Sequence, residues 1–133
     1  MIYMLDTNIC IYIIKKKPLI VLETLRKLDI GDVCISAITL AELEYGVKKS
    51  QQRERNQVAL TAFLSPVEIL PFSDSAAIIS GDIRASLEQK GQIIGAYDLL
   101  IAAHALSEHL ILVTNNTDEF KRIPGLSLEN WAG

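Results

Sequence analysis

The sequence predicts one α/β domain over residues 1–133, in which helices cover both faces of a central parallel sheet. Half of the 133 residues are hydrophobic, which is enough to fill the core of a single domain of ordinary size. The expected strands are short runs that are apolar throughout, a pattern typical of strands buried on both faces. Segments with helical spacing separate these runs, so the expected architecture is a three-layer α/β/α sandwich.

Five apolar runs are the expected strands. They are residues 2–5 (IYML), 33–35 (VCI), 67–70 (VEIL), 110–114 (LILVT) and 126–128 (LSL). In a parallel sheet covered on both faces, ligands bind outside the carboxyl ends of the strands. The first strand leads directly into Asp6 and the fourth into Thr114 and Asn116, so we expect a functional site at that edge.

Six segments with helical spacing are the expected helices. They are residues 8–15, 18–28, 37–48, 52–64, 74–89 and 98–108. Pro18 suits the first turn of the second helix, and Ser36 resembles the N-cap of the third. Lys90 and Gly91 end the fifth helix. The polar residues 115–118 (NNTD) are expected to form a loop.

Composition narrows the class of protein. The net charge is −3 and the pI is about 5.3, which counts against a strongly basic, non-specific nucleic-acid binder, although three short basic runs exist. Cys10 and Cys34 have apolar neighbours and no CxxC spacing, which favours buried free thiols. The chain shows no signal-peptide pattern and no apolar run near the ~20 residues of a membrane span, so we expect a cytoplasmic protein.

Three acidic residues interrupt apolar surroundings. Asp6 closes the first strand, and Asp98 opens the apolar helix DLLIAAHAL. Either side chain could serve only as a helix N-cap, and the sequence leaves that alternative open. Glu42 lies on a helical stripe that is expected to face the core, where an unpaired carboxylate is costly. The other members of that stripe are Ile38, Thr39, Tyr45 and Gly46.

These three carboxylates predict a metal site if they meet at one edge of the sheet. Their mutual repulsion would oppose assembly, and a bound divalent cation would offset it. Oxygen ligands favour Mg²⁺, with Mn²⁺ as a substitute, and such sites commonly activate water for attack on phosphates. His104 and His109 form no HxxxH or HExxH pattern, so a structural role is favoured for His104. No GxxxxGK[ST] or GxSxG motif is present.

Four motifs, in this order and spacing, resemble the PIN-domain proteins and, more closely, the VapC toxins of bacterial toxin–antitoxin modules. They are MLDTN, ISAITLAELEYGV, IGAYDLLIAAHA and LVTNNTDEFKRIPGL, and the resemblance runs from Met4 to about Trp131. It implies an α/β/α sandwich and a Mg²⁺-dependent endoribonuclease. It also implies cleavage of tRNA or rRNA with inhibition of translation, leaving a 5′-phosphate and a 3′-hydroxyl.

The resemblance also assigns residues. Metal ligands of the family correspond to Asp6 and Asp98, and its inward glutamate to Glu42. Our hypothesis is that Glu42 binds the metal through water or orients the attacking water. Thr7 and Asn8 match the residues that follow the first aspartate, and we expect Thr7 to form a hydrogen bond within the site. The family's fourth acid corresponds to Asn116, an amide, so one firmly held Mg²⁺ is expected before a second. Asp118 and Glu119, which follow Asn116 closely in the sequence, are two further candidates to support the metal site.

The resemblance further implies partners. A cognate VapB-type antitoxin is expected to place its tail in the cleft, and a homodimer is expected to align the basic runs for RNA. Candidates to line the antitoxin groove are Ile11, Tyr12, Ile14 and Tyr45. Alternatively, a structured RNA could be bound by a few placed contacts, for which the sequence offers Lys15, Lys16, Lys17 and Arg84 as candidates.

Three alternative functions stay open at this level. One is a Mg²⁺-dependent phosphatase with Asp6 as nucleophile, although Asn8 stands where a DxD motif has its second acid. The others are a structure-specific DNA nuclease and a binding module that has lost catalysis.

Overall fold

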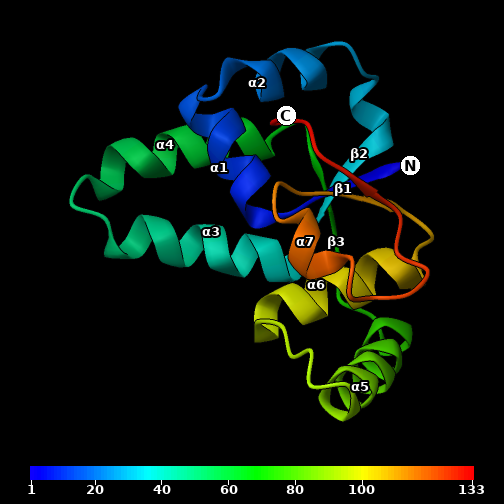
Figure 1. Cartoon of the computed structure of the whole chain (residues 1–133). Helices are drawn as coiled ribbons and strands as arrows, with labels where there is room; N and C mark the ends of the chain where they lie inside the picture. The colour runs from blue at the N-terminus through cyan, green and yellow to red at the C-terminus, as the bar shows by residue number, and fades with distance from the viewer.

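The computed structural model describes residues 1–133 as five strands, seven α-helices and one 3₁₀ turn (Figure 1). The strands are β1 (Tyr3–Leu5), β2 (Val33–Ser36), β3 (Glu68–Leu70), β4 (Ile111–Val113) and β5 (Leu128–Glu129). The helices are α1 (Thr7–Lys15), α2 (Leu19–Arg26), α3 (Ala37–Lys49), α4 (Arg53–Leu64), α5 (Asp74–Gln89), α6 (Ala96–Ser107) and α7 (Thr117–Phe120), and the 3₁₀ turn is η1 (Ile30–Asp32). None of the helices combines the length and the hydrophobicity that a membrane span requires.

All five strands are parallel, in the order β3-β2-β1-β4-β5. Tyr3 is in register with Val33 on one side and with Ile111 on the other. The chain therefore winds outward from β1 in one direction to β3, and then returns to build β4 and β5 on the other side. The carboxyl ends of β1 and β4 meet at this reversal, which is where sheets of this type place ligands.

Alternate residues of the three central strands, β1, β2 and β4, enter two separate cores. Leu5, Ile35 and Val113 face the layer formed by α1 to α4, whereas Met4 and Leu112 face the layer formed by α5, α6 and α7. Figure 1 shows α1, α2 and α4 on one side of the strands and α5 and α6 on the other. Helices therefore cover both faces of the sheet, and the predicted three-layer sandwich is confirmed. Burial on both faces explains why the central strands are apolar throughout.

Two local predictions are wrong. The last strand lies at Leu128–Glu129 rather than 126–128, and it is too short for its residues to carry a strand pattern. Part of the expected loop at 115–118 is helical, because Thr117–Phe120 form a single turn that buries Phe120 completely. Tertiary packing stabilises this turn, since an isolated helix of four residues does not form in water.

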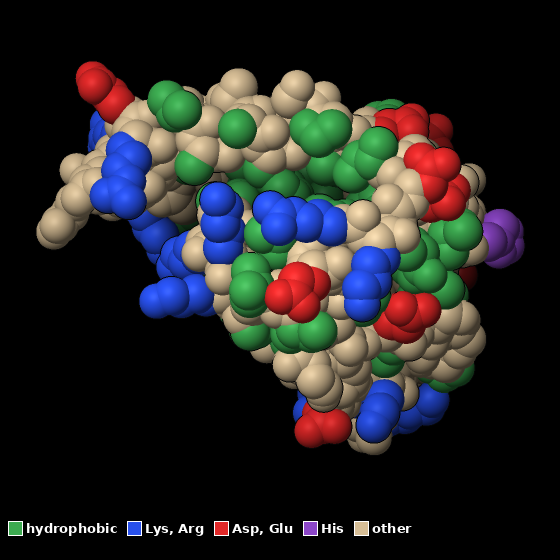
Figure 2. All heavy atoms as spheres, turned by 90° about the horizontal axis from the view of Figure 1, so that it is seen from above, with side chains coloured by type: hydrophobic (Ala, Val, Ile, Leu, Met, Phe, Trp, Pro, Cys, Tyr) green, Lys and Arg blue, Asp and Glu red, His purple; other side chains and the backbone are tan.

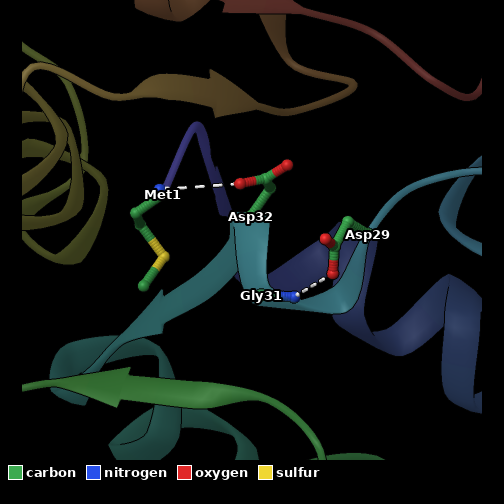
Figure 3. A network of polar contacts seen from close by, with 4 residues as sticks. All are labelled: Met1, Asp29, Gly31 and Asp32. Carbon is green, nitrogen blue, oxygen red and sulfur yellow. Dashed lines mark hydrogen bonds and ion pairs between the residues drawn. The ribbon is translucent and has the colours of Figure 1, made fainter.

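Structural contacts occupy the amino edge of the sheet, opposite the reversal. Figure 3 shows the α-amino group of Met1 3.6 Å from a carboxylate oxygen of Asp32, and Oδ1 of Asp29 accepting a hydrogen bond from the Gly31 N–H at 3.1 Å. These contacts fix η1 next to the start of β1. They involve no group of the candidate site, which lies at the carboxyl edge.

Both cysteines are free and buried, as expected. Cys10 faces the α1–α4 core and Cys34 the α5–α7 core. Burial raises the pKa of Cys34 to about 12, and it raises the pKa of Cys10 well above the usual value. Both thiols are therefore protonated at neutral pH and act as small apolar side chains.

Candidate active site

Asp6 is the first carboxylate of the site. Its N–H donates to the carbonyl of Val113 at 3.0 Å, which joins the carboxyl end of β1 to β4. Its side chain is only 4% exposed, and Oδ1 accepts the N–H of Ile9 at 3.0 Å as the N-cap of α1. Burial raises the pKa of Asp6, hydrogen bonds from Thr114 and Ile9 partly oppose this, and the charge of Glu42 adds to it. Asp6 is thus a helix cap, but one that holds a buried charge without a cation.

Glu42 reaches the site from α3. Its Oε1 accepts a hydrogen bond from Oγ1 of Thr7 at 2.6 Å, so the first residue of α1 orients the carboxylate. The helical stripe that was expected to face the core does so only in part. Thr39 is fully buried, whereas Tyr45 is 65% exposed, because the second half of α3 packs against α1 and α4 instead of the sheet.

Asp98 is the third residue of α6 and does not cap it. The N-cap is Gly95, and no side chain caps this helix. The pKa of Asp98 rises from 3.8 to about 7, first through desolvation and then through the negative charges of Glu119, Asp6 and Glu42. The structure therefore brings the three sequence-predicted acids within electrostatic reach of one another.

Glu119 is a fourth carboxylate, which the sequence did not separate from its neighbour Asp118. Oε1 of Glu119 accepts the N–H of Gly95 at 3.1 Å, and Oε2 accepts from the side-chain amide of Asn116. A Cβ at Gly95 would lie 3.6 Å from Oδ2 of Asp98, in ordinary van der Waals contact with this carboxylate. The Asp118 side chain is 99% exposed and lies 4.0 Å from Nζ of Lys121, so it points into solvent.

The remaining candidates have supporting positions. Asn116 donates its N–H to Oγ1 of Thr114 at 3.0 Å, and its amide holds Glu119. Thr114, which the sequence placed at the end of the fourth strand without assigning it a role, is fully buried, and its hydrogen bond lowers the pKa of Asp6. Asn8 is exposed and forms no side-chain hydrogen bond. Only its N–H takes part, by favouring the ionised form of Asp6.

The donor set fits a hard divalent cation. Asp6, Glu42, Asp98 and Glu119 form no ion pair, because the three pairs of the structure involve other acids. Unpaired carboxylates this close favour the binding of a cation with oxygen ligands. No three His, Cys, Asp or Glu side chains already form a metal-binding group, so ligation by three carboxylates requires side-chain rotation. Glu42 and Asp98 are only partly buried.

His104 lies apart from the carboxylates. Its ring is fully buried, Nδ1 is 2.8 Å from Oγ of Ser36, and the rings of His104 and Phe72 form a T-shaped pair with 5.4 Å between centroids. Desolvation lowers its pKa, so the ring is neutral at physiological pH. These contacts support the structural role expected for His104.

A groove of about 290 Å³ opens beside Glu42, between α1, α3 and α4. Glu42 and Lys15 are its charged lining residues. Its apolar wall consists of Ile11, Ile14, Leu43, Val47 and Leu60. This groove is continuous with the site because Glu42 lines it. A larger groove of about 540 Å³ between α5 and α6 contains none of the four carboxylates.

Comparison with known proteins identifies the family. The family model for the PIN domain matches residues 3–126. Ribonuclease VapC2 from Rickettsia felis is 55% identical over 132 residues, which cover 98% of both chains. This chain is a PIN-domain protein of the VapC family. The predicted resemblance is therefore confirmed over nearly the whole sequence.

Other comparisons agree with this PIN-domain assignment. The tRNA(fMet)-specific endonuclease VapC of Shigella flexneri is 48% identical over 130 residues, 98% of each chain. The crystal structure of VapBC2 from Rickettsia felis bound to a promoter DNA fragment contains a chain with a TM-score of 0.92 and 54% identity, covering 98% of this chain and 99% of that one. DNA-bound VapBC from Salmonella typhimurium gives a TM-score of 0.93 at 48% identity and 98% coverage of both chains.

Proposed function

We propose that this VapC-family protein is a metal-dependent endoribonuclease toxin that a VapB-type antitoxin neutralises. The observation that carries the proposal is the group of four carboxylates without cationic partners at the reversal of the sheet. High identity to proteins named ribonuclease VapC over nearly their full length supports it. A single domain over residues 1–133 would contain the whole site.

We propose Mg²⁺ as the resident ion, with Mn²⁺ as a substitute. When bound, the ion supplies a Lewis acid that activates water and stabilises charge on the phosphorus oxygens. Asp6 and Asp98 would hold it. Glu42, which accepts a hydrogen bond from the hydroxyl of Thr7, would orient the attacking water or bind the ion through a water molecule. Glu119 would add negative charge next to Asp98.

Structured RNA is the proposed substrate, and initiator tRNA is the first candidate. The Shigella flexneri relative, 48% identical to this chain, is named a tRNA(fMet)-specific endonuclease. Cleavage of such an RNA in the cytoplasm would inhibit translation. We propose products with a 5′-phosphate and a 3′-hydroxyl, as expected for attack by an activated water.

The groove beside Glu42 is the proposed site of the antitoxin tail. Its apolar wall would receive apolar side chains of the tail, and a basic side chain there would neutralise Glu42 and Asp98. Solved relatives that are complexes named VapBC support an assembly with antitoxin. We also propose that the toxin is a homodimer.

The test is cleavage of initiator tRNA by purified protein with Mg²⁺, compared with EDTA. We expect Asp6→Asn to reduce cleavage by about 100-fold or more, because a carboxylate ligand becomes a neutral amide. Asp118→Asn is the matched control and should cleave normally, because Asp118 points into solvent. Equal cleavage by Asp6→Asn and the wild type would refute the proposal.

Parallel reactions separate this proposal from the alternatives. Cleavage of single-stranded or branched DNA in preference to RNA would indicate a DNA nuclease. Trapping of a phosphoaspartate at Asp6 would indicate a phosphatase. Absence of both cleavage and Mg²⁺ binding by calorimetry would indicate a binding module.

A further inference from the structure

Five basic side chains surround the outer end of the groove between α1, α3 and α4. Lys48 and Lys49 occupy the last turn of α3, Arg53 and Arg55 the first turn of α4, and Lys15 lines the groove itself. We name these five residues the α3–α4 cationic patch. Figure 2 shows Lys and Arg side chains gathered at the left end of its face, where Figure 1 places the turn between α3 and α4.

The patch is a local excess of positive charge on an acidic protein. It holds five of the 13 Lys and Arg residues of a chain whose net charge is −3. None of the five forms an ion pair. The acids of residues 44–55 are Glu44 and Glu54, and Glu44 is only partly exposed and accepts a hydrogen bond from Gln57. The positive charge is therefore available to a partner.

Helix stability accounts for only part of the patch. Lys48 and Lys49 lie at the carboxyl end of α3, where the helix dipole favours positive charge. Arg53 and Arg55 lie at the amino end of α4, where the dipole disfavours it. The two arginines also repel the neighbouring lysines. The charges of Arg53 and Arg55 therefore destabilise this part of the fold, and binding of an anionic ligand would offset their repulsion.

The patch is continuous with the catalytic carboxylates. Glu42 and Lys15 line the same groove, and Tyr45 and Lys49 follow Glu42 on nearby faces of α3. Lys49 is seven residues beyond Glu42, which corresponds to about 10 Å along a helix, or on the order of three phosphates of a helical strand. Tyr45 stands between them, 65% exposed, with Nζ of Lys49 5.1 Å from its ring centre.

We propose that the α3–α4 cationic patch binds the phosphates of the RNA strand on one side of the scissile bond, and that Tyr45 stacks on a base of that strand. This proposal rests on the proposed endoribonuclease function. A polyanion fits the unpaired cations, and an exposed aromatic ring beside a cation is typical of contacts with single-stranded nucleic acid. The patch would give an acidic protein a local site for RNA without a basic surface overall.

The first test measures RNA binding rather than cleavage. In the Asp6→Asn background, the double variant Lys49→Gln/Arg53→Gln is compared with Lys27→Gln/Lys90→Gln, which removes the same charge from the ends of α2 and α5. The Kd for an initiator tRNA transcript is measured at several salt concentrations. The logarithm of the association constant (1/Kd) decreases with the logarithm of the salt concentration. In the patch variant this slope should become less steep by about 0.7 to 0.9 for each phosphate that is no longer neutralised. The control variant should keep the slope of the parent.

The second test concerns Tyr45. Tyr45→Ala should raise the Kd for the same RNA about fivefold or more, whereas Tyr45→Phe, which keeps a stacking face, should leave it nearly unchanged. Equal slopes in the patch and control variants, or equal effects of Ala and Phe at Tyr45, would overturn the proposal. Loss of antitoxin binding with an unchanged RNA slope would assign the patch to the antitoxin. If the wild type cleaves tRNA in all these cases, the proposed function stands and only the patch assignment fails.

Discussion

Replacing Asp98 by asparagine should stabilise the metal-free protein at pH 8. The pKa of Asp98 is about 7 in the folded protein, against 3.8 for an ordinary aspartate. Above pH 7 the folded state must therefore hold a charge that the unfolded chain carries at no cost. Below about pH 4 both states are protonated, and the penalty disappears. Asparagine has nearly the same shape and carries no charge at any pH, so it removes this penalty.

The size of the effect follows from the pKa difference. One pKa unit corresponds to about 1.4 kcal/mol, so full ionisation costs about 4 kcal/mol as an upper bound. Asp98 is partly exposed, and solvent screening reduces this to about 2 kcal/mol. At pH 5 the folded carboxyl keeps its proton, and the cost falls below about 1 kcal/mol. Asp98→Asn should therefore gain about 2 kcal/mol at pH 8 and much less at pH 5.

The assay is urea unfolding in EDTA at both pH values, followed by fluorescence. Trp131 is the only tryptophan and lies in the α1–α4 core, so its emission reports unfolding directly. Asp118→Asn serves as the control and should change stability little at either pH, because its carboxylate is exposed. Destabilisation by Asp98→Asn at pH 8, or an equal gain at both pH values, would refute the reasoning. Millimolar Mg²⁺ should stabilise the wild type more than the variant, because ligand binding to the folded state adds to its stability.

Two further predictions concern the neighbours of these acids. Thr7→Val removes the donor to Glu42 and should lower kcat for RNA about tenfold or more, as expected for the loss of a hydrogen bond to a charged group. Thr7→Ser keeps the donor and should retain most activity; equal losses in the two variants would contradict the role of the hydroxyl. Glu119→Gln removes a negative charge beside Asp98 and should lower its pKa. The stability gained from Asp98→Asn at pH 8 should then shrink, and an unchanged gain would show that the two groups are not coupled.

Much of the site could be predicted because chain position and burial agree. Asp6 follows an apolar strand, and in a parallel sheet the end of such a strand lies at the ligand-binding edge. Asp98 interrupts a helix that is otherwise almost entirely apolar, and a charge there requires an explanation. The alternative of simple capping could not be decided from the sequence. The structure decides it differently at the two positions, since Asp6 caps α1 whereas Asp98 caps nothing.

The position of the Glu119 side chain in the site could not be predicted from the sequence. Asp118 and Glu119 are neighbours in one turn of helix, so their side chains point about 100° apart. Which of them faces Asp98 depends on how α7 is rotated, and that rotation is set by the burial of Phe120 against α6 and its surroundings. Four residues carry too little periodicity to reveal a helix, much less its orientation. The same limit applies to Tyr45, whose exposure depends on where α3 leaves the sheet.

The reversal of the sheet also determines when an active molecule can exist during synthesis. Asp6 leaves the ribosome long before its neighbouring strand β4, which begins only at Ile111, and the carboxylate of Glu119 follows still later. A nascent chain that stops in α6 has Asp6, Glu42 and Asp98 but no strand to bring the first and last together. A chain that ends before β4 therefore lacks the strand that holds Asp6 beside the later part of the site. Only a chain that extends past Glu119 can bring all four carboxylates together.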